Sequence, residues 1–137
     1  MTGFVEPEPG HDTVPWWEAL AEGQLTVPTC DDCRRRFFPP QPYCPHCGST
    51  SAQLQPHAGD GTVYSWVVVH RAFAEEFAGD VPYGIVAVDL DGGGRLVGRF
   101  SGDPGLLRDG LPVTAEIEGV ADFGILWFRP HDEEGTR

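Results

Sequence analysis

The most informative segment of this chain reads Cys30-Asp-Asp-Cys33, then ten residues, then Cys44-Pro-His-Cys47-Gly48. Each Cys-x-x-Cys pair puts two thiolates on the same side of a tight turn, and two such turns complete a tetrahedral shell with Zn–S bonds of about 2.3 Å. Four sulfurs leave no open coordination position, so the metal would be structural rather than catalytic. The spacing predicts one structural Zn²⁺ held by Cys30, Cys33, Cys44 and Cys47.

Two other uses of the cysteines are weighed against metal binding. Disulfides suit an oxidising compartment, and redox chemistry needs an exposed pair of low pKa beside a βαβ pattern, which this sequence lacks. His46 lies between two of the expected ligands, but a histidine in such a turn is more often solvated, so it is left out of the ligand set. Iron in place of zinc stays open.

Length and charge restrict the function classes. At 137 residues the chain is one average domain or two small ones, too short for a barrel-type or doubly wound enzyme. Its 21 acidic and 9 basic residues give a net charge of −12, which repels phosphate backbones and anionic lipids. The absence of lysine excludes Schiff-base and P-loop lysine chemistry. Because we find neither a membrane span nor a signal-peptide pattern, we expect a cytoplasmic location.

The composition of the chain changes near residues 56–59. Nine of the thirteen prolines precede residue 57, and fourteen of the eighteen glycines follow it. Such a shift indicates a boundary between segments. We expect an N-terminal arm with an amphipathic helix over residues 1–24, a zinc ribbon over 25–56, a barrel over 57–130 and an acidic tail over 131–137.

Alternation of apolar and polar residues with period two dominates the chain after residue 60. Short strands are expected at 61–70, 82–90, 95–100, 112–118 and 124–128, with a hairpin joining the second to the third. Five short strands with glycines where the chain must bend are typical of a small Greek-key barrel. The fold class is therefore mostly β, with a five-stranded OB-fold barrel at the C-terminal end and an open sandwich as the alternative.

One segment of the acidic N-terminal arm has a helical pattern, Val14-Pro-Trp-Trp-Glu-Ala-Leu-Ala-Glu22. Trp16 and Leu20 are four residues apart and share one face, and Gly23 ends the helix. On so short a helix one tryptophan covers the chain's own core, which leaves the other for a partner. Trp16, Trp17 and Leu20 are therefore the candidate partner-binding residues.

Three consecutive arginines, Arg34-Arg-Arg36, follow the first cysteine pair. They suit the phosphates of a nucleotide-bearing ligand such as coenzyme A, but we favour a solvated charge run that balances the thiolates. The sequence has no Gly-x-Ser-x-Gly, His-Glu-x-x-His or dinucleotide-binding motif. Its histidines and carboxylates cannot be grouped into an acid–base pair from spacing alone, so no catalytic residue is assigned.

The order of these motifs resembles the domain-of-unknown-function family thirty-five. The likeness is carried by the paired tryptophans, the cysteine ribbon, the segment Gly61-Thr-Val-Tyr-Ser-Trp66, the strand ending Val-Asp-Leu90 and the segment Leu111-Pro-Val113. Members of that family join a rubredoxin-like zinc ribbon to an OB fold. The resemblance carries the metal ligands over to the four cysteines, and it carries over no catalytic residue.

This resemblance implies a non-catalytic accessory subunit in a hetero-oligomer. Its partner would be a thiolase-fold, lipid-transfer-protein-like retro-aldolase that acts on acyl-CoA thioesters in steroid side-chain degradation. The alternatives are a subunit of a thiolase-fold acyltransferase and a stand-alone acyl-CoA-binding protein. Nucleic-acid binding, although common for OB folds, is the least favoured because it needs a basic groove with stacking aromatics.

We expect no measurable affinity for single-stranded DNA or RNA at physiological salt. With 21 acidic residues against 9 basic ones, binding releases few counterions from the nucleic acid. Fluorescence anisotropy with labelled oligonucleotides measures this, and a bacterial single-stranded-DNA-binding protein serves as the positive control. Micromolar binding by this chain would contradict the prediction.

Overall fold

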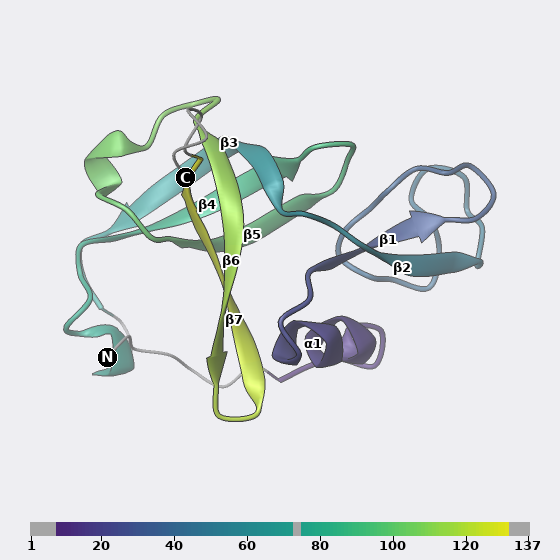
Figure 1. Ribbon diagram of the computed structural model, residues 1–137, viewed down its shortest axis with the longest axis horizontal. Helices are drawn as coiled ribbons and strands as arrows, with labels where there is room; N and C mark the ends of the chain where they lie inside the picture. Colours follow the sequence, from purple (N-terminus) through teal and green to yellow (C-terminus); the bar gives the residue numbers. More distant parts are fainter. Residues whose placement is uncertain (1–7, 73–74, 132–137) are drawn as a thin grey trace.

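The structure, a computed structural model, describes residues 8–72 and 75–131 (Figure 1). Residues 1–7 of the expected arm and 132–137 of the expected acidic tail lie outside this range. The elements in chain order are α1 (Val14–Ala21), β1 (Thr26–Cys30), β2 (Ala52–Pro56), β3 (Asp60–Val69), η1 (Glu75–Phe77), β4 (Tyr83–Leu90), β5 (Arg95–Phe100), η2 (Pro104–Leu106), β6 (Pro112–Val120) and β7 (Phe123–Pro130). No helix in the described residues is long and apolar enough to cross a membrane.

The predicted mostly β fold with a five-stranded barrel is confirmed. The strands close in the order β3-β4-β5-β7-β6, with β3 returning to β6 where Gly61 pairs with Val113. Among the strands of residues 8–72 and 75–131, only β5 and β7 pair in parallel. Residues of β4 alternate between half-buried and buried, as period-two patterning requires of a strand with one face on a core. The closed barrel rules out the open sandwich.

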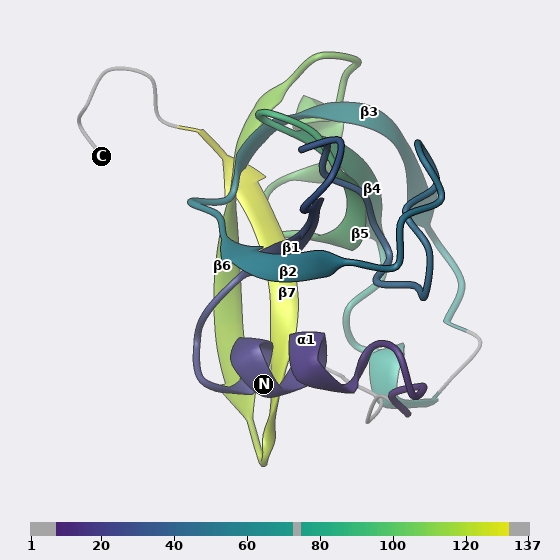
Figure 2. The same cartoon turned by 90° about the vertical axis from the view of Figure 1, so that its right-hand side faces the viewer.

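The helix α1 packs directly against the β6–β7 hairpin, beside the lower part of β7 in Figure 2. The approach is so close that a Cβ atom on Gly124 would collide with the carbonyl oxygen of Leu20. Leu20 is 1% exposed and Trp16 is 6% exposed. The indole Nε1 of Trp16 also donates a hydrogen bond of 2.9 Å to the carbonyl oxygen of Thr26, which satisfies the buried polar end of the ring.

This burial corrects part of the expectation for the helix. Trp16 and Leu20 belong to the chain's own hydrophobic core and have no surface left for a partner. The physical reason is that the face on which they lie is the one pressed against the hairpin. Trp17 is half-buried, with its ring edge-to-face against Trp16 at 4.8 Å, and it alone stays a candidate for partner contact.

Besides the burial of β1 in the shared hydrophobic core, two hydrogen bonds to one carbonyl oxygen join the β1–β2 ribbon to the barrel. The turn between β4 and β5 points toward the ribbon in Figure 1, and the carbonyl oxygen of Asp91 lies at this turn. It accepts hydrogen bonds from Arg36 Nη1 at 3.0 Å and from His57 Nε2 at 2.8 Å. His57 Nδ1 in turn accepts from the amide of Gly59 at 2.8 Å. These contacts orient the ribbon on the barrel.

We expect Trp16→Ala to lower the free energy of unfolding by about 3–5 kcal/mol, because it removes a large buried ring and leaves a cavity. Urea denaturation followed by circular dichroism measures the loss. Val97→Ala is the control, because Val97 is 65% exposed and its truncation should change the free energy by less than about 0.5 kcal/mol. Equal effects of the two substitutions would show that Trp16 is not a core residue.

Candidate metal centre

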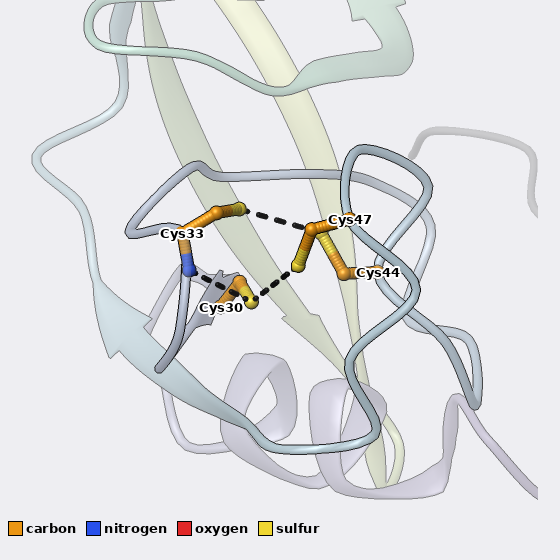
Figure 3. A group of neighbouring side chains, drawn as sticks. All are labelled: Cys30, Cys33, Cys44 and Cys47. Atoms are coloured by element: carbon orange, nitrogen blue, oxygen red, sulfur yellow. Dashed lines mark hydrogen bonds between the residues drawn. The ribbon is translucent and has the colours of Figure 1, made fainter.

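The four cysteine sulfurs converge from two loops that face each other (Figure 3). All four are free thiols, and their Sγ atoms lie within 4.8 Å of one another. Cys30 and Cys47 are separated by 3.6 Å between sulfurs, and Cys33 and Cys44 by 3.7 Å. A tetrahedral shell with Zn–S bonds of about 2.3 Å has sulfurs about 3.8 Å apart. The arrangement therefore fits a four-thiolate metal site.

The two cysteine turns have the same backbone geometry. In each turn the residue after the second cysteine donates to the carbonyl of the first: Arg34 N to Cys30 O at 3.0 Å, and Gly48 N to Cys44 O at 2.8 Å. Both donors adopt a left-handed conformation, with φ of 67° at Arg34 and 79° at Gly48. Glycine adopts this conformation freely, whereas a side chain there costs roughly 1–2 kcal/mol. The first turn thus tolerates strain that the second avoids.

The thiols of the cluster differ in acidity. A hydrogen bond from the backbone amide of Cys33 stabilises the Cys30 thiolate and lowers its pKa to about 6. For Cys47, the amide of Ser49 lowers the pKa, but contacts with neighbouring sulfurs and burial outweigh it and raise the pKa to about 12. A thiolate in the cluster therefore opposes deprotonation of the neighbouring thiols. A bound cation is needed before all four sulfurs can be thiolates.

The outer part of the ribbon, around the cysteines, has only a small core of its own. Its own buried cluster consists of Phe37, which is 4% exposed, with Cys30 and Cys44. The ring of His46 contacts the backbone, with Nε2 3.2 Å from the carbonyl oxygen of Arg36. The exclusion of His46 from the ligand set agrees with this geometry. With so small a core, the ribbon depends on ligation of its cysteines.

The three arginines that follow the first turn differ in exposure to solvent. Arg34 and Arg35 are exposed, whereas Arg36 is half-buried and occupied by the carbonyl of Asp91. The predicted coenzyme A contact therefore stays a prediction for all three arginines, with Arg34 and Arg35 the more accessible. Arg36 has an additional role at the ribbon–barrel junction.

One described cluster brings together a hydroxyl, a histidine and a carboxylate. Thr114 Oγ1 donates to Asp60 Oδ1 at 2.8 Å and lies 2.7 Å from His131 Nδ1. Because the single hydroxyl proton goes to the carboxylate, His131 must act as the donor toward Thr114 and cannot serve as its base. In an activated nucleophile the hydroxyl donates its proton to the histidine, whereas here the histidine donates to the hydroxyl. We therefore interpret the cluster as structural.

A second cluster, which no sequence pattern predicted, lies on the outer surface of the barrel. Arg99 stacks against the rings of Tyr83 and Trp127, with its Cζ atom 4.1 and 4.8 Å from their centroids. Its Nη1 also pairs with Asp80 at 3.3 Å. These four residues line a hollow of about 300 Å³. Asp80 and Tyr83, Arg99, and Trp127 come from three separate segments of the chain, so no local pattern could have revealed the cluster. The stack and the ion pair hold the guanidinium group of Arg99 in place on this face.

Comparison with known proteins assigns both the ribbon and the barrel to known domain families. The family model for the "ChsH2, rubredoxin-like zinc ribbon domain" matches residues 17–52, and that for the "ChsH2, C-terminal OB-fold domain" matches residues 54–118. A "DUF35 domain-containing scaffold protein" of Methanocaldococcus jannaschii is 34% identical over 111 residues, covering 79% of this chain and 78% of that protein. The chain belongs to the DUF35 family.

Two further relatives of this DUF35 chain have names that include an enzyme activity. A solved structure described as "Ltp2-ChsH2(DUF35) aldolase" matches it with a TM-score of 0.81 and 34% identity, covering 91% of this chain and 98% of the matched one. A "Probable enoyl-CoA hydratase alpha subunit" of Thermomonospora curvata is 34% identical over 130 residues. That alignment covers 92% of this chain but 40% of the relative, so the DUF35 chain spans less than half of that protein's length.

We expect the purified DUF35 chain to hold one metal ion and to lose it as the pH falls. Protons compete with the metal for the thiolates, most strongly at Cys47, whose pKa is raised to about 12. Cys44→Ser should abolish binding and unfold the ribbon, since structural zinc contributes roughly 10–16 kcal/mol in small peptides.

Elemental analysis and a chromophoric chelator, read between neutral and acid pH, measure the metal content. His46→Ala is the matched control and should keep the metal, because its ring contacts a carbonyl and not the sulfurs. Freshly purified protein that contains disulfides and no metal would contradict the prediction.

Proposed function

We propose that this chain is a non-catalytic subunit that binds and activates a thiolase-fold retro-aldolase acting on acyl-CoA thioesters, with a steroid side chain as the acyl group. One observation carries the proposal: the chain aligns with 98% of the matched chain from the Ltp2-ChsH2(DUF35) aldolase at 34% identity. Two similar proteins named as a hydratase subunit and a scaffold protein support a role within assemblies.

The geometry supports an accessory role. The cysteines are arranged for a closed four-sulfur shell, which has no position for substrate. The Thr114 cluster has its donor order reversed, so it provides no activated hydroxyl. A subunit without a reacting group of its own can still raise turnover. Holding the partner's reacting groups in place lowers the activation barrier by several kcal/mol.

We propose that the metal is Zn²⁺ and that its role is to shape the ribbon. The four thiolates suit zinc, which has no preference for an open or planar geometry. Ligation fixes the two turns, and through Arg36 the first of them is held against the barrel at Asp91. Zinc would therefore set the orientation of the surface that the partner meets.

A second candidate function is direct binding of acyl-CoA. The exposure of Arg34 and Arg35 beside the first cysteine turn favours it, since arginine binds phosphate groups in a bidentate manner. An acyltransferase partner in place of the aldolase would use the same subunit architecture. Titration of the isolated chain with acyl-CoA separates the carrier from the subunit, because only the carrier binds the ligand alone.

The test co-expresses the chain with the Ltp2-like, thiolase-fold protein of the same organism. We expect the two to co-elute in size-exclusion chromatography, and C–C cleavage of an acyl-CoA substrate to be roughly tenfold or more faster in the complex than with the companion alone. His70→Ala is the control, because His70 is exposed and has no assigned role in proton transfer.

Two results would refute the proposal. The first is a companion that is fully active and soluble alone. The second is a tenfold loss of activity from His70→Ala in an intact complex, since it would place a reacting group on this chain.

A further inference from the structure

A groove of about 600 Å³ runs between α1 and the tip of the β6–β7 hairpin. Its apolar lining comes mainly from the helix face opposite the core, where Val14, Trp17 and Ala21 recur at a spacing of three and four residues. Phe123 adds an aromatic ring from the hairpin. Val14 is 37% exposed. The groove is therefore a site where apolar side chains meet solvent.

The charge around this groove has one sign. Its charged lining residues are Glu18 and Glu22 on the helix and Asp122 on the hairpin, and its lining includes no basic residue. The described chain from residue 8 to residue 33 contains no arginine, and the chain has no lysine at all. Within the part of the chain that the structure describes, none of the three carboxylates forms an ion pair. An occupant that brings positive charge would gain from all three, whereas an acidic one would be repelled.

We propose that this groove is the docking site for a basic amphipathic segment of the partner subunit, with apolar side chains against Trp17 and arginine or lysine side chains against Glu18, Glu22 and Asp122. The inference rests on the proposed function for the existence of such a partner. Trp17 is suited to the role of anchor, because Trp16 already holds its ring edge-to-face at 85° and little freedom is lost on binding.

Other occupants of the groove are disfavoured by charge. A second copy of this chain would bring a net charge of −12 toward an acidic rim. Nucleic acid and anionic lipid are repelled by the same carboxylates. A basic protein segment is the class that satisfies both the apolar floor and the rim.

The test compares charge reversals in the complex. We expect Glu18→Lys and Glu22→Lys each to weaken association with the thiolase-fold companion by roughly tenfold, and the wild-type affinity to fall with added salt. Trp17→Ala should weaken it by about thirtyfold. Isothermal titration calorimetry on the full, metal-loaded chain measures these constants, and circular dichroism confirms that each variant is folded.

Asp109→Lys is the matched control, because it makes the same change of charge on an exposed residue in the loop between η2 and β6. That loop lies at the upper end of the barrel in Figure 1, whereas α1 lies at the lower end. We expect its affinity to stay within a factor of about two of the wild type, since distant exposed charges are screened. An equal loss of affinity in Asp109→Lys and Glu18→Lys would show that only the net charge of the chain matters. That result would overturn the groove assignment.

A peptide titration separates this inference from the proposed function. The probe is an acetylated peptide of alternating leucine and arginine, and the control peptide has glutamate in place of arginine. We expect only the basic peptide to shift the indole N–H resonance of Trp17 in the isolated chain, and Glu18→Lys to reduce the shift.

If the companion fails to bind but the basic peptide shifts Trp17, the proposed function is wrong and the groove assignment holds. If the companion binds all groove variants as well as the wild type, the groove assignment is wrong and the proposed function holds. If neither peptide shifts Trp17, or the acidic peptide or a second copy of the chain binds there, the groove assignment is also wrong.

Discussion

A single hydrophobic core joins the helix, the first ribbon strand and the barrel, and the other features of the structure depend on it. It runs from Trp16 and Leu20 on α1 through Val27 on β1 to Phe128 on β7. Because Val27 is fully buried in this core, the ribbon cannot swing away from the barrel without exposing apolar surface. The Asp91 carbonyl, which accepts from Arg36 and His57, then sets the angle at which the ribbon leaves the core.

The outer part of the ribbon is held by a different kind of interaction. Beyond β1 its buried residues are few, and Phe37 forms a small cluster with Cys30 and Cys44. Ligation must therefore replace the burial that this segment lacks. Two turns with the same hydrogen bonds present the sulfurs, and the left-handed Arg34 shows that the first turn is kept even at the cost of strain. A subunit built in this way offers a partner a surface of defined shape without providing a reacting group.

The barrel strands and the metal ligands could be predicted because their signals are local. Alternation of apolar and polar residues over residues 113–118 is visible in a few consecutive residues, and a Cys-x-x-Cys turn spans four. Strand β2 was missed, because it is only five residues long, contains no β-branched or aromatic residue and is mostly exposed. It forms because its backbone pairs with β1, as where Ala52 meets Cys30. The stack of Tyr83, Arg99 and Trp127 was missed for a similar reason, since it brings together β4, β5 and β7.

The sequence by itself determined the fold class, the four candidate ligands and the face that Trp16 shares with Leu20. Spacing along a turn, a strand or a helix is set by backbone geometry that does not depend on distant residues. Only the tertiary structure decided which tryptophan belongs to the core. The close contact between Leu20 and Gly124 sets the rotation of α1 on the hairpin, and this rotation buries Trp16 while it leaves Trp17 beside an acidic groove. Such a choice depends on packing between segments about one hundred residues apart, which no local pattern records.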